Sequence, residues 1–310
     1  MKNYYELVDA NKTKSNLVIL GFITFIAVAA YFIGYALGYG WGFVGYALIL
    51  SGIMSFASFY YSDKIVLSLS NAIPANPRVH FDFYTVTDNL SKVAGIPMPR
   101  LYIIEDSAMN AFATGRDPSH AVVVATTGIL AKLTRTELEG VIGHELSHVK
   151  NYDTRLMGIV TILIGVITLL ADFLLRFSFF GGRRRSRDDE GGQLQIVFFL
   201  IGLVLAILSP LISNLIRLAI SRRREFLADA SSAQLTKYPE GLARALEKLA
   251  SDIEPLEAAN KATAHLYLVN PFHFDSANIK KIKDQGSIGW FANLFNTHPP
   301  IVERIKVLRS

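Results

Sequence analysis

The stretch that most restricts how this chain can fold runs from Ser15 to Ser62, because it contains no charged residue. A glycine-rich turn at residues 38–42 interrupts it. One helix needs about 20 consecutive apolar residues to cross a bilayer core. The sequence therefore predicts two membrane-spanning helices, at about residues 17–37 and 43–61. A cleaved signal peptide fits the first of these poorly, because the apolar segment is too long and a second one follows it.

Basic residues on both sides of this pair predict its orientation. Lys12 and Lys14 precede the first helix, Lys64 follows the second, and the turn between them has no lysine or arginine. Cytoplasmic ends of membrane helices carry an excess of Lys and Arg, so both the N-terminus and the region after residue 62 are expected in the cytoplasm. The composition, 51% hydrophobic and 18% charged, agrees with a mainly α-helical integral membrane protein.

Two further apolar segments, at residues 156–180 and 193–220, predict a helical hairpin between two soluble regions. An arginine-rich loop at residues 183–187 would lie outside if both segments crossed the membrane, against the expected distribution of positive charge. A shallow re-entrant hairpin therefore stays open beside a pair of full spans. The number of crossings must be even if the soluble regions at 63–155 and 221–310 form one site.

The first soluble region is predicted to be a mixed α and β domain with a small sheet. Residues 100–105 and 121–125 are rich in β-branched or apolar residues and predict strands, whereas residues 82–93 have apolar positions at helical spacing. Thr134 followed by Glu137 is a capping box that predicts the start of another helix.

That helix carries the sequence His144-Glu145-Leu146-Ser147-His148. A spacing of four residues is about one helical turn, so both imidazoles leave the same face and can bind one metal ion. Glu145 would lie beside the metal, where a carboxylate can take a proton from an attacking water and pass it to the leaving amine. This pattern predicts metal-dependent peptide hydrolysis.

A second pair of residues four apart, Glu225 and Asp229, follows the predicted hairpin. Glu225 is the candidate third ligand, and Asp229 the candidate acceptor for the far ring nitrogen of a ligand histidine. The alternative is that both acids balance Arg222–Arg224 on a solvated helix. The chain has no cysteine, so disulfides and thiolate ligands are excluded and the metal must be bound by nitrogen and oxygen.

Several motifs in the same order resemble the HtpX family of membrane-bound zinc metalloproteases, gluzincins related to the CAAX prenyl protease. The resemblance covers nearly the whole chain. Besides the N-terminal helix pair it rests on five segments, which are residues 110–115 (NAFATG), 120–125 (HAVVVA), 144–148 (HELSH), 225–229 (EFLAD) and 297–300 (THPP).

The resemblance implies a zincin-like α+β protease domain with one Zn²⁺ per chain, bound by His144, His148 and Glu225. It also implies that Glu145 is the catalytic acid and base. The family cleaves misfolded or damaged membrane proteins in protein quality control and the stress response. The expected location is therefore the inner (cytoplasmic) membrane, as a multi-pass protein whose protease domain faces the cytoplasm.

Three more residues are candidate contacts to the substrate or the transition state. Asn110 and Ala113 belong to a segment that, with residues 121–125, resembles the edge strand on which related proteases hold substrate by backbone pairing. The alternative is a plain core strand. His298 could stabilise an oxyanion, or merely precede two prolines at the start of a C-terminal helix, which is the favoured reading.

Three other functions fit the sequence less well. A net charge of +5 is explained by membrane-flanking lysines and arginines, so no nucleic-acid partner is predicted. A peptidase that processes lipidated or signalling peptides would need a larger enclosing chamber than these short apolar segments can build. A zinc-stabilised scaffold without catalysis would not need Glu145. The predicted partners are the lipid bilayer and unfolded or damaged membrane proteins.

Overall fold

The computed structural model describes residues 4–36, 40–163, 222–252, 254, 256, 266–268 and 299–310. In chain order its elements are α1 (Tyr4–Ala36), α2 (Gly40–Leu69), β1 (Ile73–Pro74), α3 (Phe81–Ala94), β2 (Arg100–Ile104), β3 (Ala111–Thr114), η1 (Pro118–His120), β4 (Val122–Thr126), α4 (Thr127–Lys132), α5 (Arg135–Lys150), α9 (Arg222–Thr236), α10 (Pro239–Ser251) and α13 (Ile301–Leu308). Residues 153–163 are helical as well, and the rest of the predicted hairpin lies outside the described residues.

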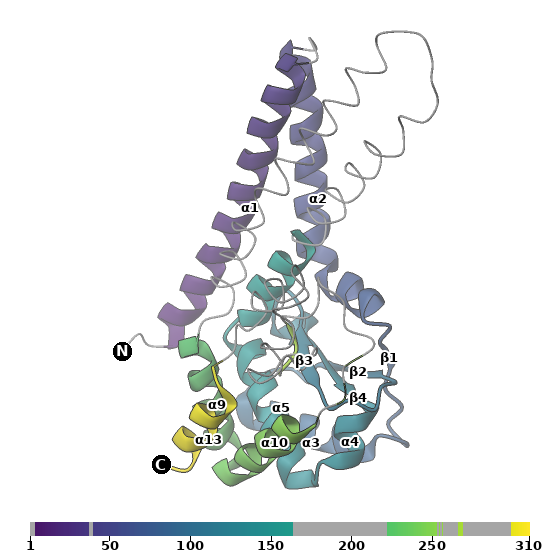
Figure 1. Cartoon of the computed structure of the whole chain (residues 1–310), viewed down its shortest axis with the longest axis vertical. Helices are drawn as coiled ribbons and strands as arrows, with labels where there is room; N and C mark the ends of the chain where they lie inside the picture. The colour runs from purple at the N-terminus through teal and green to yellow at the C-terminus, as the bar shows by residue number, and fades with distance from the viewer. Residues whose placement is uncertain are drawn as a thin grey trace, which may run out of the picture.

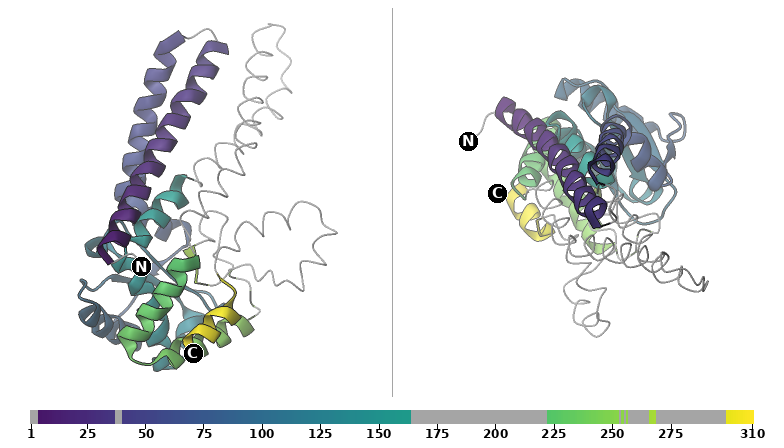
Figure 2. Two further views of the ribbon diagram at one scale, coloured as in Figure 1. Left: turned by 90° about the vertical axis from the view of Figure 1, so that its left-hand side faces the viewer. Right: turned by 90° about the horizontal axis from the view of Figure 1, so that it is seen from above.

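Helices α1 and α2 run side by side away from the remainder of the described chain (Figures 1 and 2). Both are longer than the predicted spans, since α1 begins at Tyr4 and α2 continues to Leu69. Hydropathy locates the boundary of the apolar stretch, whereas the helix continues through polar residues that also favour helical structure. Within the described residues, the segment Val44–Leu69 is long and apolar enough to cross a membrane.

Beyond α2, the described chain is built on a four-stranded mixed sheet with the order β1-β2-β4-β3. β2 and β4 are parallel, and β1 and β3 are antiparallel to their neighbours. All five residues of β4 are buried, as expected for a β-branched strand inside a sheet that is covered on both faces. The strands and the helix predicted at residues 100–105, 121–125 and 82–93 are confirmed as β2, β4 and α3.

The predicted edge strand is confirmed for one of its two segments and wrong for the other. The segment at 121–125 corresponds to β4, which lies between β2 and β3, so its assignment to an edge is wrong. β3, within the predicted segment 110–115, does lie at an edge of the sheet, and β1 lies at the other. Sequence alone cannot separate the two, because both are short and apolar, and only the pairing order decides which one keeps an open side.

The central helix α5 begins where the capping box predicts. The backbone N–H of Thr134 donates to Oε2 of Glu137 at 2.7 Å. Lys248 of α10 donates to the same carboxylate oxygen at 2.7 Å, so the cap also binds a neighbouring helix. α5 packs against α3, α9, α10 and β3, and this position carries its histidines into the interior.

Candidate metal centre

Two histidines on α5 face one point in the interior. His144 and His148 are 1% and 6% exposed. Their Nε2 atoms are 3.1 Å apart, so one helical turn brings both ring nitrogens to the same place, as the spacing predicts.

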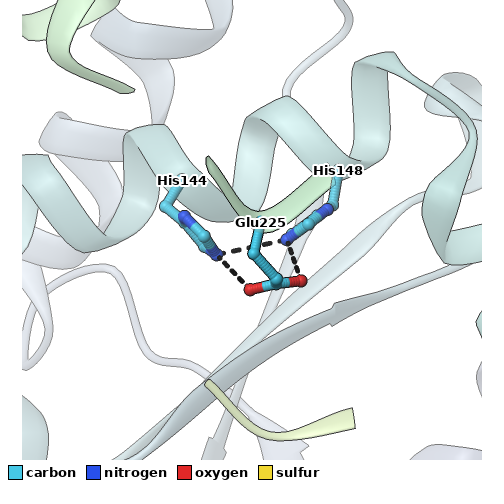
Figure 3. A group of neighbouring side chains, drawn as sticks. All are labelled: His144, His148 and Glu225. Atoms are coloured by element: carbon cyan, nitrogen blue, oxygen red, sulfur yellow. Dashed lines mark hydrogen bonds and ion pairs between the residues drawn. The ribbon is translucent and has the colours of Figure 1, made fainter. Parts of the chain in front are cut away.

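α9 brings a carboxylate to these nitrogens. Oε2 of Glu225 is 3.6 Å from Nε2 of His144, and Oε1 is 3.5 Å from Nε2 of His148 (Figure 3). Close packing of the two helices makes this possible. Ser232 of α9 donates a 2.6 Å hydrogen bond to the carbonyl of Gly140, and a Cβ atom at Gly143 would lie 2.8 Å from the Ser232 hydroxyl.

One donor atom from each of the three residues lies within 4.8 Å of the other two, close to what a tetrahedral zinc requires. Ligand atoms about 2.0–2.1 Å from the metal lie about 3.3 Å from one another. The two ring nitrogens are 3.1 Å apart, and each lies 3.5 or 3.6 Å from a different oxygen of the Glu225 carboxylate. Two imidazoles and one carboxylate also leave a fourth position open, which is the donor set of a catalytic rather than a structural zinc site. The residues therefore fit the metal that the sequence predicts.

A buried ion pair orients the first histidine. Nδ1 of His144 lies 2.9 Å from Oδ1 of Asp229, and Arg304 of α13 donates to both oxygens of that carboxylate, at 2.6 and 2.9 Å. Burial alone would raise the pKa of Asp229, but the hydrogen bonds from His144 and Arg304 lower it to about 2. The carboxylate is thus ionised at any working pH. It can hold the Nδ1 proton and leave Nε2 to face a metal.

The same carboxylate also changes the basicity of the ring. Burial by itself would lower the pKa of His144, yet the hydrogen bonds to Asp229 and Glu225 raise it to about 9. When no metal is bound, both ring nitrogens of His144 are therefore protonated at neutral pH, and the ring is positively charged.

The second histidine has its own carboxylate. Nδ1 of His148 lies 2.9 Å from Oδ2 of Asp153, which is 2% exposed. The other oxygen of Asp153 accepts a 2.9 Å bond from Arg224. Burial lowers the pKa of His148, but the charge of Glu225 and the hydrogen bond to Asp153 outweigh it and raise the pKa. Both histidines are thus held at Nδ1 by buried carboxylates.

The other predicted site residues take different places. Glu145 is 4% exposed within α5. Burial by itself would lower the pKa of Arg304, but Asp229 and then Glu225 raise it. The charge of Glu145 raises that pKa further. Asn110 is buried immediately before β3, where its Oδ1 accepts a 3.1 Å bond from the Ala111 backbone. Ala113 is a residue of β3, which packs against α5. His298 lies outside the described residues.

The backbone of β3 has one edge that faces away from β4, although all four residues of the strand are buried. Thr126 N donates to Asn110 O, so alternation along the antiparallel pair directs the N–H and C=O groups of Ala111 and Ala113 outward. The carbonyl of Ala111 accepts a 3.0 Å hydrogen bond from Leu268 N. In the part of the chain that the structure describes, no other backbone group pairs with this outer edge.

The solvated-helix interpretation of Glu225 and Asp229 is wrong, since these residues are 2% and 1% exposed. Sequence reasoning missed three residues that hold them and the histidines in place. Arg304 carried a usable signal, because an arginine in line with the apolar Ile301, Ile305 and Leu308 requires a buried partner. Asp153 and Asn11 carried no such signal. Asp153 meets His148 only after α5 has ended, and Asn11 meets Asp153 across 142 positions of the sequence.

Comparison with known proteins gives consistent matches. The profile described as Peptidase family M48 matches residues 79–310. The Protease HtpX homolog of Thermoanaerobacter pseudethanolicus is 42% identical over 100% of this chain and 98% of its own length. That of Streptococcus uberis is 41% identical over 98% of this chain and 99% of its own length. The crystal structure of S. mikatae Ste24p superposes with a TM-score of 0.50 at 19% identity, over 99% of this chain and 67% of that one, so the fold is shared.

Proposed function

The chain belongs to peptidase family M48 and is an HtpX-like metalloprotease, and on that premise we propose that it hydrolyses misfolded or damaged membrane proteins at the cytoplasmic face of the membrane. The observation that carries the chemistry is the donor set of His144, His148 and Glu225, with both histidines held at Nδ1 by carboxylates. We assign these three residues as the ligands of one Zn²⁺ per chain.

The bound metal would supply a Lewis acid that polarises the scissile carbonyl and acidifies the attacking water. Glu145 follows His144 on α5 and is assigned as the general base, which takes a proton from the water at its carboxylate and later passes it to the leaving amine. Its burial excludes bulk water from this proton transfer and strengthens its electrostatic effect. Asp229 and Asp153 take no part in the proton transfer. They hold Nδ1 of each ligand histidine, which keeps Nε2 directed at the metal position.

β3 supports the assignment of a substrate-binding edge. A peptide extended beside it could receive a hydrogen bond from the N–H of Ala113 and donate one to its carbonyl. Such pairing uses groups that every peptide has, so it gives affinity with little preference for sequence. That property suits an enzyme whose substrates share a loss of structure and no common motif.

The helices α1 and α2 support a membrane location. Large apolar side chains along α2 are exposed, among them Tyr46, Ile49 and Ile53 at 77%, 64% and 61%. A lipid environment would remove this surface from water. The lysines that flank the pair orient the protease domain toward the cytoplasm, and we propose a multi-pass protein of the inner (cytoplasmic) membrane.

The proposal is tested with the full chain reconstituted in lipid vesicles beside one membrane protein, supplied in a native and in a destabilised variant. We expect cleavage of the destabilised variant within its cytoplasmic segments, slower cleavage of the native one, and loss of both with a chelator or with Glu145→Gln. Equal cleavage of the two variants would contradict the proposed quality-control function but not the peptidase activity. A chelator-resistant activity would contradict the metal mechanism.

A further inference from the structure

The first helix of the chain enters the interior beside the metal centre. Asn11 of α1 is 3% exposed. Its Nδ2 donates to Oδ1 of Asp153 at 2.7 Å and to the carbonyl of Asn151 at 2.8 Å, and its Oδ1 accepts from Arg224 at 2.9 Å. A single asparagine thus joins α1, the segment after α5, and α9.

Asp153 connects Asn11 to the predicted ligand His148. Its Oδ1 is bonded by Asn11 and Arg224, which leaves Oδ2 to contact Nδ1 of His148 at 2.9 Å. If the Oδ1 bonds are lost, the carboxylate is free to rotate, and the ring that it orients loses a fixed partner. Loss of a group that orients a metal ligand typically weakens metal affinity by about 10- to 100-fold.

We propose that Asn11 is a positioning residue of the metal centre, which fixes Asp153 and through it His148, and so couples metal affinity to the docking of α1. The inference rests on the proposed metal-dependent function. It goes beyond that function because it makes the first membrane helix a part of the catalytic architecture as well as an anchor. Coupling is reciprocal, so metal binding must also stabilise the docked position of α1.

Other contacts of α1 supply a control. Asn16 accepts a 3.2 Å bond from Arg155 and so also joins α1 to the segment after α5, but it is exposed and, among the described residues, has no hydrogen bond to Asp153 or His148. Lys12 lies 4.7 Å from the ring centre of Tyr152 in the same region. If Asn11 only docks the helix, its loss should resemble the loss of Asn16.

The experiment measures metal affinity of the full chain in detergent, by competition with a chromophoric chelator for Zn²⁺ and by the visible spectrum with Co²⁺. We expect Asn11→Leu to weaken binding about tenfold or more and to alter the Co²⁺ spectrum. Asn16→Ala should change neither. Wild-type affinity and spectrum in Asn11→Leu would overturn the proposal.

A double-mutant cycle tests whether Asn11 acts through Asp153. In an Asp153→Ala background, Asn11→Leu should add no further loss of metal affinity, because the group that it positions is absent. Additive losses would overturn the proposed route.

Hydrogen exchange covers the case in which Asn11→Leu does not fold. In the wild-type chain, Zn²⁺ should slow amide exchange in α1 around Asn11 relative to the metal-free form, and an unchanged rate there would overturn the coupling. These readouts do not depend on proteolysis. A chain that binds zinc with the predicted sensitivity to Asn11 but cleaves nothing would disprove the function and keep this inference.

Discussion

Arg304 forms a two-pronged ion pair with Asp229, with both side chains 1% exposed. The pair lies directly behind His144, since the same carboxylate is 2.9 Å from Nδ1 of that ring. The last described helix of the chain therefore holds a predicted metal ligand in place. The ion pair matters for stability as well as for function, because a buried charge that loses its partner strongly destabilises the folded state.

Arg304→Ala should lower the free energy of unfolding by about 3–5 kcal/mol, since it leaves the Asp229 carboxylate buried without its cation. Denaturant unfolding of the metal-free chain in detergent measures this. The matched control is Arg309→Ala. Arg309 is the C-cap residue of α13, five positions after Arg304, and its guanidinium pairs with Glu240 at the surface. The guanidinium also pairs with Glu247, but Arg309→Ala should lose much less stability than Arg304→Ala, because solvent screens exposed pairs. Equal losses would contradict the buried-pair argument.

Glu145→Gln should retain zinc but lose about 10²- to 10⁴-fold in kcat, since the amide has the shape of the carboxylate but cannot accept the proton of the water. Metal analysis and steady-state hydrolysis of a peptide substrate check the two parts. Glu139→Gln, on the same helix and paired with Arg135, is the control and should keep full activity. Substantial turnover by Glu145→Gln would exclude it as the general base.

Zinc affinity should rise with pH between 7 and 9. His144 has a pKa raised to about 9 in the metal-free protein, so below that pH a metal must displace its proton. The apparent affinity should fall about tenfold for each pH unit below 9 on account of this residue. Calorimetry in buffers of different ionisation enthalpy counts the released protons. An affinity that is independent of pH from 7 to 9 would contradict the protonated state.

Ala113→Pro should raise KM for an extended peptide about 2- to 13-fold, the effect of one hydrogen bond of about 0.5–1.5 kcal/mol. Proline removes the outward N–H of the edge strand but not a bond to β4. Ala113→Ser, which keeps the N–H at similar size, should behave like the wild type. If both variants bind substrate like the wild type, the peptide does not pair at this position.

The local elements of this fold follow closely from the sequence, because their signals lie within a few residues. The capping box at Thr134 fixed the start of α5, and the four-residue spacing brought His144 and His148 to one point. The pairing order of the sheet did not follow. β3 and β4 look alike as apolar strands, and only the long-range register leaves β3 at the edge.

The outer contacts of the candidate site were the least predictable part. Their residues are polar side chains whose partners lie far away in sequence, such as Asn11 with Asp153 or Arg304 with Asp229. Periodicity reports which face a helix buries, but it does not report which buried polar group meets which. The burial of Arg304 could have been inferred from its apolar neighbours, but its partner could not.

The wide separation of these partners sets a condition on biosynthesis. Asn11 and Arg304 stand near opposite ends of the sequence, and His148 and Glu225 lie on either side of the segment at residues 164–221. The arrangement around the two histidines can be completed only after the ribosome has translated the chain through Arg304. A nascent chain that ends before residue 225 therefore lacks the proposed ligand Glu225, so under the proposed function peptidase activity cannot precede the translation of that residue.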